Sequence, residues 1–162
     1  MLHQPTISVI IATYNRAHYV AETIDSVLSQ EFRDFELIVV DDGSTDNTRE
    51  LLRRYDDRLR FYCQENRGPS AARNLGVRHA RGEWIAIQDS DDLCRPNHLE
   101  VLFAYVAAQL DCRMVFANGA YLGRPNLGVT RSFRSENPGV SPATESTSKT
   151  CLRKASFDCK HP

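Results

Sequence analysis

Several features that commonly mark a class of protein are missing from this 162-residue chain. Its five cysteines include no C-x-x-C pair, and their odd number suggests neither a disulfide framework nor a zinc site. A compartment that keeps thiols reduced is the simpler expectation. No apolar run approaches the ~18 residues of a spanning helix, and the first residues lack the charged and apolar regions of a signal peptide. The sequence predicts a cytoplasmic protein and leaves peripheral association with the inner face of a membrane open.

An excess of charge of one sign and a glycine-rich phosphate loop are also missing. The formal net charge is -1, whereas a dedicated nucleic-acid binder usually has a basic excess, so no nucleic-acid partner is expected. The first apolar run is followed by Thr13-Tyr14-Asn15-Arg16-Ala17. Neither G-x-x-x-x-G-K-[ST] nor G-x-G-x-x-G is present, so a P-loop and a dinucleotide fingerprint are excluded.

What the chain does contain is a regular alternation of apolar strands and amphipathic helices. Strands are expected at 7–12, 35–40, 59–63, 84–88 and 114–117, because these runs are short and apolar. Helical spacing of apolar residues, with cap candidates such as Ser44 or Asp46 and Ser70, fills the intervals. Strands separated by helices imply right-handed crossovers. The fold class predicted is α/β, a three-layer, Rossmann-like domain with a mostly parallel sheet.

Polar clusters follow three of these strands. They are Thr13-Tyr14-Asn15-Arg16, Asp41-Asp42-Gly43-Ser44 and Asp89-Ser90-Asp91-Asp92. Ligands of open parallel sheets bind outside the carboxyl ends of the strands, and parallel strands put those ends on one rim. We therefore expect the three clusters to form one binding site.

The acidic cluster at 89–92 indicates the chemistry of that site. Carboxylates without nearby His or Cys favour Mg²⁺ or Mn²⁺, which typically bridge to phosphate oxygens, so a phosphorylated ligand is implied. Arg73, in the first turn of a predicted helix, can add positive charge. The alternatives are an acidic turn that only solvates a strand end and an ordinary exposed helix arginine.

Four ordered motifs give the chain a family resemblance. The segments 7–16, 36–46, 68–74 and 82–92 closely resemble those of the family 2 inverting glycosyltransferases of the GT-A fold. The resemblance covers roughly residues 6–117, about the donor-binding half of such an enzyme.

The resemblance also implies roles for individual residues. Thr13, Tyr14 and Asn15 would line the nucleotide base pocket, and Asp42 would hydrogen-bond the base. Arg73 would lie near the base and diphosphate, while Asp89 and Asp91 match the D-x-D motif. The first of the two would reach the ribose side and the second the metal, with Asp89 a further candidate metal ligand. For Tyr14 the alternative is a packing aromatic.

The implied activity is metal-dependent, inverting transfer of a sugar from a nucleotide-sugar donor, most simply a UDP-sugar, with Mn²⁺ or Mg²⁺. The acceptor, whether glycan, lipid-linked or protein, is not identified. The general base normally follows the D-x-D motif at a distance, and no residue of this sequence is assigned to it. A non-catalytic nucleotide-sugar binding fragment is therefore an alternative function, and a different nucleotide enzyme on a doubly wound sheet is another.

The composition changes near residue 124. Four of the seven prolines and all three lysines lie in 124–162, which is also rich in Ser and Thr. We expect a nucleotide-sugar-binding domain at 1–123, incomplete at its C-terminus, and an irregular tail at 124–162 that is disordered or foreign to the fold.

Overall fold

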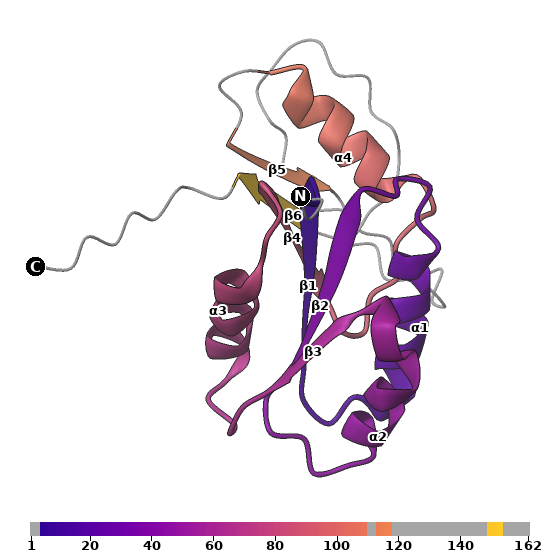
Figure 1. The fold of residues 1–162 in the computed structure, drawn as a ribbon, viewed down its shortest axis with the longest axis vertical. Helices are drawn as coiled ribbons and strands as arrows, with labels where there is room; N and C mark the ends of the chain where they lie inside the picture. The colour runs from indigo at the N-terminus through magenta and orange to yellow at the C-terminus, as the bar shows by residue number, and fades with distance from the viewer. Residues whose placement is uncertain (1–3, 110–112, 118–148, 154–162) are drawn as a thin grey trace, which may run out of the picture.

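The sheet predicted from the alternating pattern is present. The computed structural model describes residues 4–109, 113–117 and 149–153 (Figure 1). Its strands are β1 (Ile7–Thr13), β2 (Phe35–Asp41), β3 (Arg60–Cys63), β4 (Trp84–Asp89), β5 (Met114–Ala117) and β6 (Lys149–Arg153). Its helices are α1 (Ala17–Leu28), α2 (Thr48–Leu52), the 3₁₀ helix η1 (Arg53–Arg58), α3 (Pro69–His79) and α4 (His98–Ala107).

The strand order is β3-β2-β1-β4-β6-β5. Strands β3, β2, β1 and β4 are parallel, and β6 runs antiparallel to both β4 and β5. In the parallel part Thr13 lies opposite Asp41, and Ala12 lies opposite Asp89. The carboxyl ends of β1, β2 and β4 therefore finish at the same level of the sheet.

Helices cover both faces of the sheet, which gives the three predicted layers (Figure 1). Ile7, Val9 and Ile11 of β1 belong to a core cluster shared with apolar residues of α1, α2 and α4. Ile10 belongs to a second cluster, with Ala72 of α3. This alternation follows from the two-residue period of a strand, and because both faces are covered β1 is apolar at every position except Ser8 and Thr13. The α/β fold class is confirmed.

Helix starts differ from the expected caps. Ser70 lies inside the first turn of α3, because Gly68, with φ +85°, takes the N-cap position and Pro69 begins the helix. Asn47 occupies the N-cap position of α2, although Asp46 Oδ1 accepts a hydrogen bond from Thr48 N at 3.0 Å. Both helices still begin within three residues of the start that the expected caps imply.

One strand lies within the segment expected to be irregular. Lys149–Arg153 forms β6 and inserts between β4 and β5, with Ala86 and Val115 both opposite Cys151. At these five residues the expectation of an irregular tail is wrong, because backbone pairing with two distant strands supplies order that local composition does not reveal. The rest of 124–162 lies outside the described residues, and the domain boundary at 123 stays a prediction.

Candidate functional site

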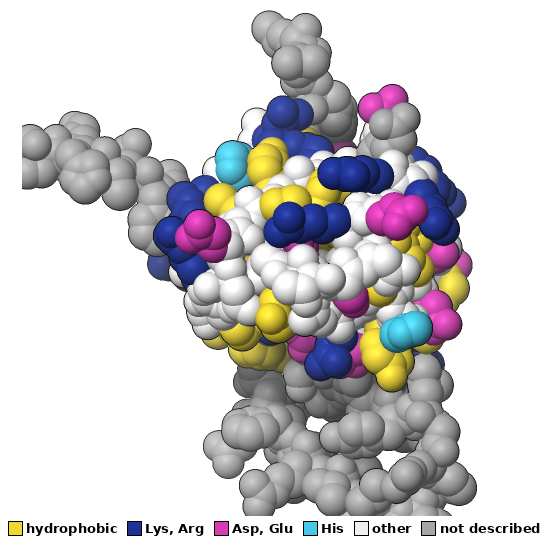
Figure 2. Space-filling view, turned by 90° about the horizontal axis from the view of Figure 1, so that it is seen from below, with side chains coloured by type: hydrophobic (Ala, Val, Ile, Leu, Met, Phe, Trp, Pro, Cys, Tyr) yellow, Lys and Arg dark blue, Asp and Glu magenta, His cyan; other side chains and the backbone are white. Residues whose placement is uncertain are grey.

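Six of the residues predicted from the sequence line one cavity at the carboxyl edge of the parallel strands. The cavity has a volume of about 360 Å³ and includes Thr13, Tyr14, Asp42, Arg73, Asp89 and Asp91 in its walls. Figure 2 shows the molecule from this end, where acidic and basic side chains lie among uncharged groups across the face. The convergence expected from the strand-end rule is therefore observed.

Asp42 is the most enclosed carboxylate in the wall of this cavity. Its residue is 3% exposed, and its backbone N–H donates to Thr13 O at 2.9 Å, which ties the end of β2 to the end of β1. Its Oδ1 accepts hydrogen bonds from Gln64 Nε2 at 2.6 Å and from Arg67 N at 3.0 Å. A buried carboxylate held in this way can accept a further hydrogen bond from a ligand donor.

Two buried polar atoms beside this cavity lack a partner among the described residues. They are Thr13 Oγ1 and Arg73 Nε. A buried polar group without a hydrogen bond costs about 1–3 kcal/mol, so such groups are uncommon in a finished interior. Both residues line the cavity, so these two atoms without a described partner lie close to it.

The acidic turn carries its carboxylates half-exposed at the cavity rim. Asp89 Oδ1 accepts from Arg73 Nη2 at 2.7 Å, and Asp91 Oδ2 lies 4.0 Å from Arg16 Nη2. The side chains of Asp89 and Asp91 are 49% and 50% exposed. Both are therefore reachable from solvent and partly compensated by arginine.

This arrangement bears on the expected metal. Within the described residues no group of three or more His, Cys, Asp or Glu side chains could hold a metal ion. Mg²⁺ and Mn²⁺ that act on phosphates are usually held by one or two carboxylates, and the remaining ligands are phosphate oxygens and water. Asp89 and Asp91 fit a site in which two carboxylates share the metal with phosphate oxygens and water. They do not supply a complete set of protein ligands.

Asn15 has a different position from the one expected. It lies outside the cavity wall, and its φ of +50° places it in the left-handed region. Its Oδ1 accepts hydrogen bonds from Thr45 N at 2.8 Å and Asp46 N at 3.4 Å, while its own N–H donates to Ser44 Oγ at 2.9 Å. Asn15 thus braces the loop after β1 against the loop after β2, and its contact with a base stays a prediction.

Asp41 has a structural role at the end of β2. Its carboxylate is fully buried, accepts from Ser44 N at 3.1 Å, and accepts from Arg49 Nε at 2.6 Å. The hydrogen bond and charge of Asp41 raise the pKa of the Arg49 guanidinium. The Asp41 side chain therefore stabilises the turn after β2, and its carboxylate is used for these structural hydrogen bonds.

Gln64 is not among the predicted site residues, and Arg16 is predicted only as part of the cluster Thr13-Tyr14-Asn15-Arg16, with no role of its own. Gln64 directly follows β3, so the same rule of strand ends could have indicated it. Arg16 precedes α1 and lines the cavity near Asp91. Its sequence neighbours Thr13, Tyr14 and Asn15 were predicted, and its charge complements the acidic turn.

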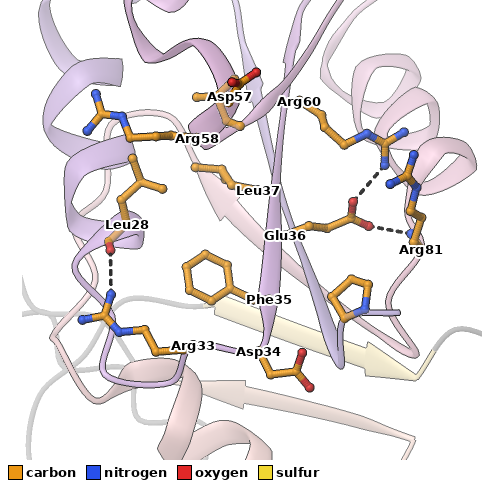
Figure 3. Close-up of a pocket in the computed structure, with 12 residues that line it drawn as sticks. Leu28, Arg33, Asp34, Phe35, Glu36, Leu37, Asp57, Arg58, Arg60 and Arg81 are labelled. Carbon is orange, nitrogen blue, oxygen red and sulfur yellow. Dashed lines mark hydrogen bonds and ion pairs between the residues drawn. The ribbon is translucent and has the colours of Figure 1, made fainter. Parts of the chain in front are cut away.

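A larger cavity, of about 570 Å³, lies at the opposite edge of the sheet (Figure 3). Its wall contains Glu36, whose carboxylate accepts from Ser8 Oγ at 2.7 Å, Arg60 Nη1 at 2.8 Å and Arg81 N at 2.6 Å. Burial alone would raise the pKa of Glu36, but these three donors outweigh it and lower the pKa. Glu36 and its three donors satisfy one another, which favours a structural role for this cluster.

Comparison with known proteins defines the class first. The fold is similar to that of glycosyltransferases: the structure of S. aureus TarS residues 1–349 aligns with a TM-score of 0.72 at 30% identity, over 91% of this chain and 47% of that one. A complex of the same protein with UDP-GlcNAc aligns at 0.65 and 30% identity, over 74% of this chain and 36% of that one. A mannosyltransferase from Pyrobaculum calidifontis in complex with GDP-Man and Mn²⁺ aligns at 0.57 and 30% identity, over 74% and 36%.

The sequence comparisons then give the family. The model for Glycosyl transferase family 2 matches residues 8–140, and the chain belongs to that family. It is 40% identical over 116 residues to glycosyltransferase GlyG of Streptococcus pneumoniae, covering 69% of this chain and 38% of that protein. It is 40% identical over 123 residues to an uncharacterized glycosyltransferase of Rickettsia felis, covering 75% and 20%. The chain thus spans well under two thirds of the length of these relatives.

The match extends the resemblance seen in the motifs. The family model continues to residue 140, past Ala117 and past the expected boundary at 123. Residues 124–140 of the segment expected to form a tail lie within the matched range. No described helix of this chain is both long and apolar enough to cross a membrane.

Proposed function

We propose that this chain binds a nucleotide-sugar donor at the carboxyl edge of its parallel strands and supports metal-dependent, inverting transfer of the sugar. The observation that carries the proposal is the convergence of Asp42, Thr13, Arg73 and the Asp89–Asp91 pair on one 360 Å³ cavity. This volume lies within the range of small-molecule sites, about 300–1,000 Å³. The structural neighbours that are complexes with UDP-GlcNAc and with GDP-Man support the donor class.

The two ends of the cavity suit the two ends of a nucleotide. Asp42 offers an anionic acceptor at the enclosed end, which suits an N–H of the base. Thr13 Oγ1, buried and without a partner among the described residues, can bond a polar atom of the nucleoside. Tyr14 is 44% exposed, which favours a ligand-facing ring over the alternative of a core aromatic.

The diphosphate belongs at the rim with Arg73, Asp89 and Asp91. Arg73 Nη2 bonds Asp89, while its Nε has no described partner and remains a donor for an anion. Asp91 and Asp89 would hold Mn²⁺ or Mg²⁺, which would neutralise the charge that develops on the leaving nucleoside diphosphate. The protein's own part is to hold donor, carboxylates and arginine in one geometry before the sugar–phosphate bond breaks.

Inversion requires the acceptor hydroxyl to attack the anomeric carbon from the side opposite the leaving group. A general base within hydrogen-bond reach would take its proton. We assign no described residue to this task and no acceptor. Donor binding and sugar transfer are therefore separable parts of the proposal.

A donor screen tests both parts. Binding and hydrolysis of UDP-, GDP- and TDP-sugars are measured with and without Mn²⁺, by calorimetry and by release of the nucleoside diphosphate. We expect metal-enhanced binding of at least one donor. Binding without release would support the alternative of a nucleotide-sugar binding fragment, and the absence of binding to every donor would contradict the proposal.

A further inference from the structure

The two oxygens of the Asp42 carboxylate differ in the hydrogen bonds that they accept from described residues. Among the described residues, two groups donate hydrogen bonds to the Asp42 side chain, Gln64 Nε2 at 2.6 Å and Arg67 N at 3.0 Å, and both reach the same oxygen, Oδ1. A carboxylate oxygen has two lone pairs for hydrogen bonding, so these donors fill Oδ1. We call Gln64 and the Arg67 N–H the Asp42 clamp. It leaves Oδ2 as the acceptor for a ligand.

The clamp is held in place by backbone contacts. Gln64 N donates to Asp41 O at 3.0 Å, which extends the β2–β3 pairing by one residue. Gly43 has φ +81°, and a Cβ on it would lie only 2.7 Å from Asn66 N. The absence of a side chain at Gly43 therefore allows the loop that carries the clamp to approach the end of β2.

An acceptor limited to one oxygen discriminates between bases. Uracil and thymine present a single imino N–H, flanked by two carbonyl oxygens, and one acceptor oxygen satisfies it. Guanine presents two N–H donors side by side, N1–H and N2–H, which a carboxylate receives best with both oxygens. With Oδ1 already hydrogen-bonded, Asp42 can accept the single N–H of uracil or thymine. Of the two N–H groups of guanine it can accept only one.

We propose that Gln64 is a positioning residue that makes Asp42 select a uracil or thymine nucleotide over a guanine nucleotide. The inference rests on the proposed function, since it concerns the base end of the same cavity. Gln64 acts through Asp42 and is not itself placed against the ligand. The observation that carries the inference is that both described donors to the Asp42 side chain bond Oδ1.

The first test compares UDP and GDP by titration calorimetry on the full chain, with Mg²⁺ at a fixed concentration. We expect UDP to bind about tenfold more tightly, the effect of one hydrogen bond to a charged group. Gln64→Met removes the amide donor and frees a lone pair on Oδ1. It should weaken UDP binding more than GDP binding, so that the ratio of the two affinities moves toward one.

The second test uses a pH profile, which a merely structural role would not alter. Gln64→Glu places a second carboxyl group beside Asp42 Oδ1. A proton shared by the two groups at low pH reproduces the amide donor, whereas two ionised groups repel each other at high pH. We expect UDP affinity in this variant to be about tenfold below wild type at pH 8 and to recover toward pH 5.5.

The other charged and titratable groups near Asp42 are the same in wild type and in the Gln64 variants. Among the described residues they include Tyr14, Arg16, Arg73, Asp89 and Asp91 in the cavity wall, and Asp41, Cys63, Glu65 and Arg67, which lie next to Asp42 or Gln64 or near them along the chain. Any pH dependence that they cause is measured in wild type and subtracted. Gln4→Glu is the matched control, because Gln4 is exposed and its side chain donates to Arg81 O, which lines the opposite edge.

The outcomes separate the two proposals. Equal selectivity in wild type and Gln64→Met, or a Gln64→Glu profile parallel to wild type, overturns the role of Gln64 while UDP binding keeps the proposed function intact. Wild-type chain that binds neither UDP nor GDP contradicts both. Melting temperatures of each variant show whether a loss of binding arises from unfolding.

Discussion

The two edges of the parallel sheet carry cavities of opposite character. At the amino edge, the larger cavity contains Glu36 with three hydrogen-bond donors around it, and Arg33 bonded to Leu28 O (Figure 3). At the carboxyl edge, the smaller cavity leaves Thr13 Oγ1 and Arg73 Nε without described partners. The comparison teaches that a candidate ligand site differs from a surface groove in whether its polar groups have hydrogen-bond partners, and not in its volume.

The difference has a thermodynamic meaning. Polar groups that satisfy one another contribute to the free energy of unfolding, whereas groups left unsatisfied lower it and are kept for another purpose. Glu36 at the amino edge should therefore matter for stability, and Asp42 at the carboxyl edge, whose Oδ2 has no described donor, should matter for binding. Substitutions at the two edges can test this division.

The largest effect is expected for Asp42→Ala. Removal of an ionised acceptor that bonds the base costs about 1.5–3 kcal/mol, which corresponds to roughly 10- to 150-fold in the dissociation constant for UDP. Titration calorimetry measures it. Unchanged UDP affinity in the folded variant would show that Asp42 at the carboxyl edge does not bond the base.

Asp91→Ala should remove the metal-dependent part of binding. We expect the rise in melting temperature caused by a nucleoside diphosphate to lose its Mn²⁺-dependent component, because one of two candidate carboxylate ligands is gone. Thermal shift with and without Mn²⁺ measures this. A Mn²⁺-dependent shift equal to that of wild type would place the metal elsewhere.

Glu36→Gln should affect stability and leave binding unchanged. Loss of its charge weakens bonds from three donors, and we expect the free energy of unfolding to fall by about 1–2 kcal/mol at pH 7. Because the folded-state pKa of Glu36 is lowered, its stabilising contribution is full above the ordinary glutamate pKa and is lost as pH falls through the lowered value. Urea unfolding should therefore show the two proteins converging in strong acid.

The smallest effect is expected for Arg33→Ala at the amino edge. Its hydrogen bond to Leu28 O is exposed and 3.4 Å long, so stability should change by no more than about 0.5 kcal/mol. UDP affinity should equal that of wild type. A clear loss of nucleotide affinity would mean that the larger cavity takes part in binding after all.

The sequence predicted much of this arrangement because its signals are local. The apolar runs of β1, β2 and β4 mark strands buried on both faces, and the strand-end rule then places Thr13, Asp42 and Asp89 together. Strand β6 could not be predicted, since its order depends on pairing with Ala86 and Val115, far away along the chain.

The details of the site were less accessible for similar reasons. The bracing by Asn15 depends on its left-handed backbone and on a loop that lies about thirty residues ahead. The clamp on Asp42 depends on a side chain at the end of β3, where no acidic motif draws attention. Such contacts are set by the tertiary approach of loops and leave no period in the sequence.

The most direct test of the account is a map of where a nucleotide binds. Amide chemical shifts of the isotope-labelled chain are followed while UDP is added in the presence of Mg²⁺. The account predicts the largest changes at Thr13, Asp42 and Arg73, with little change at Glu36 and Arg81. Changes concentrated at Glu36, Leu37 and Arg81 would contradict it, because they would assign the nucleotide to the amino edge.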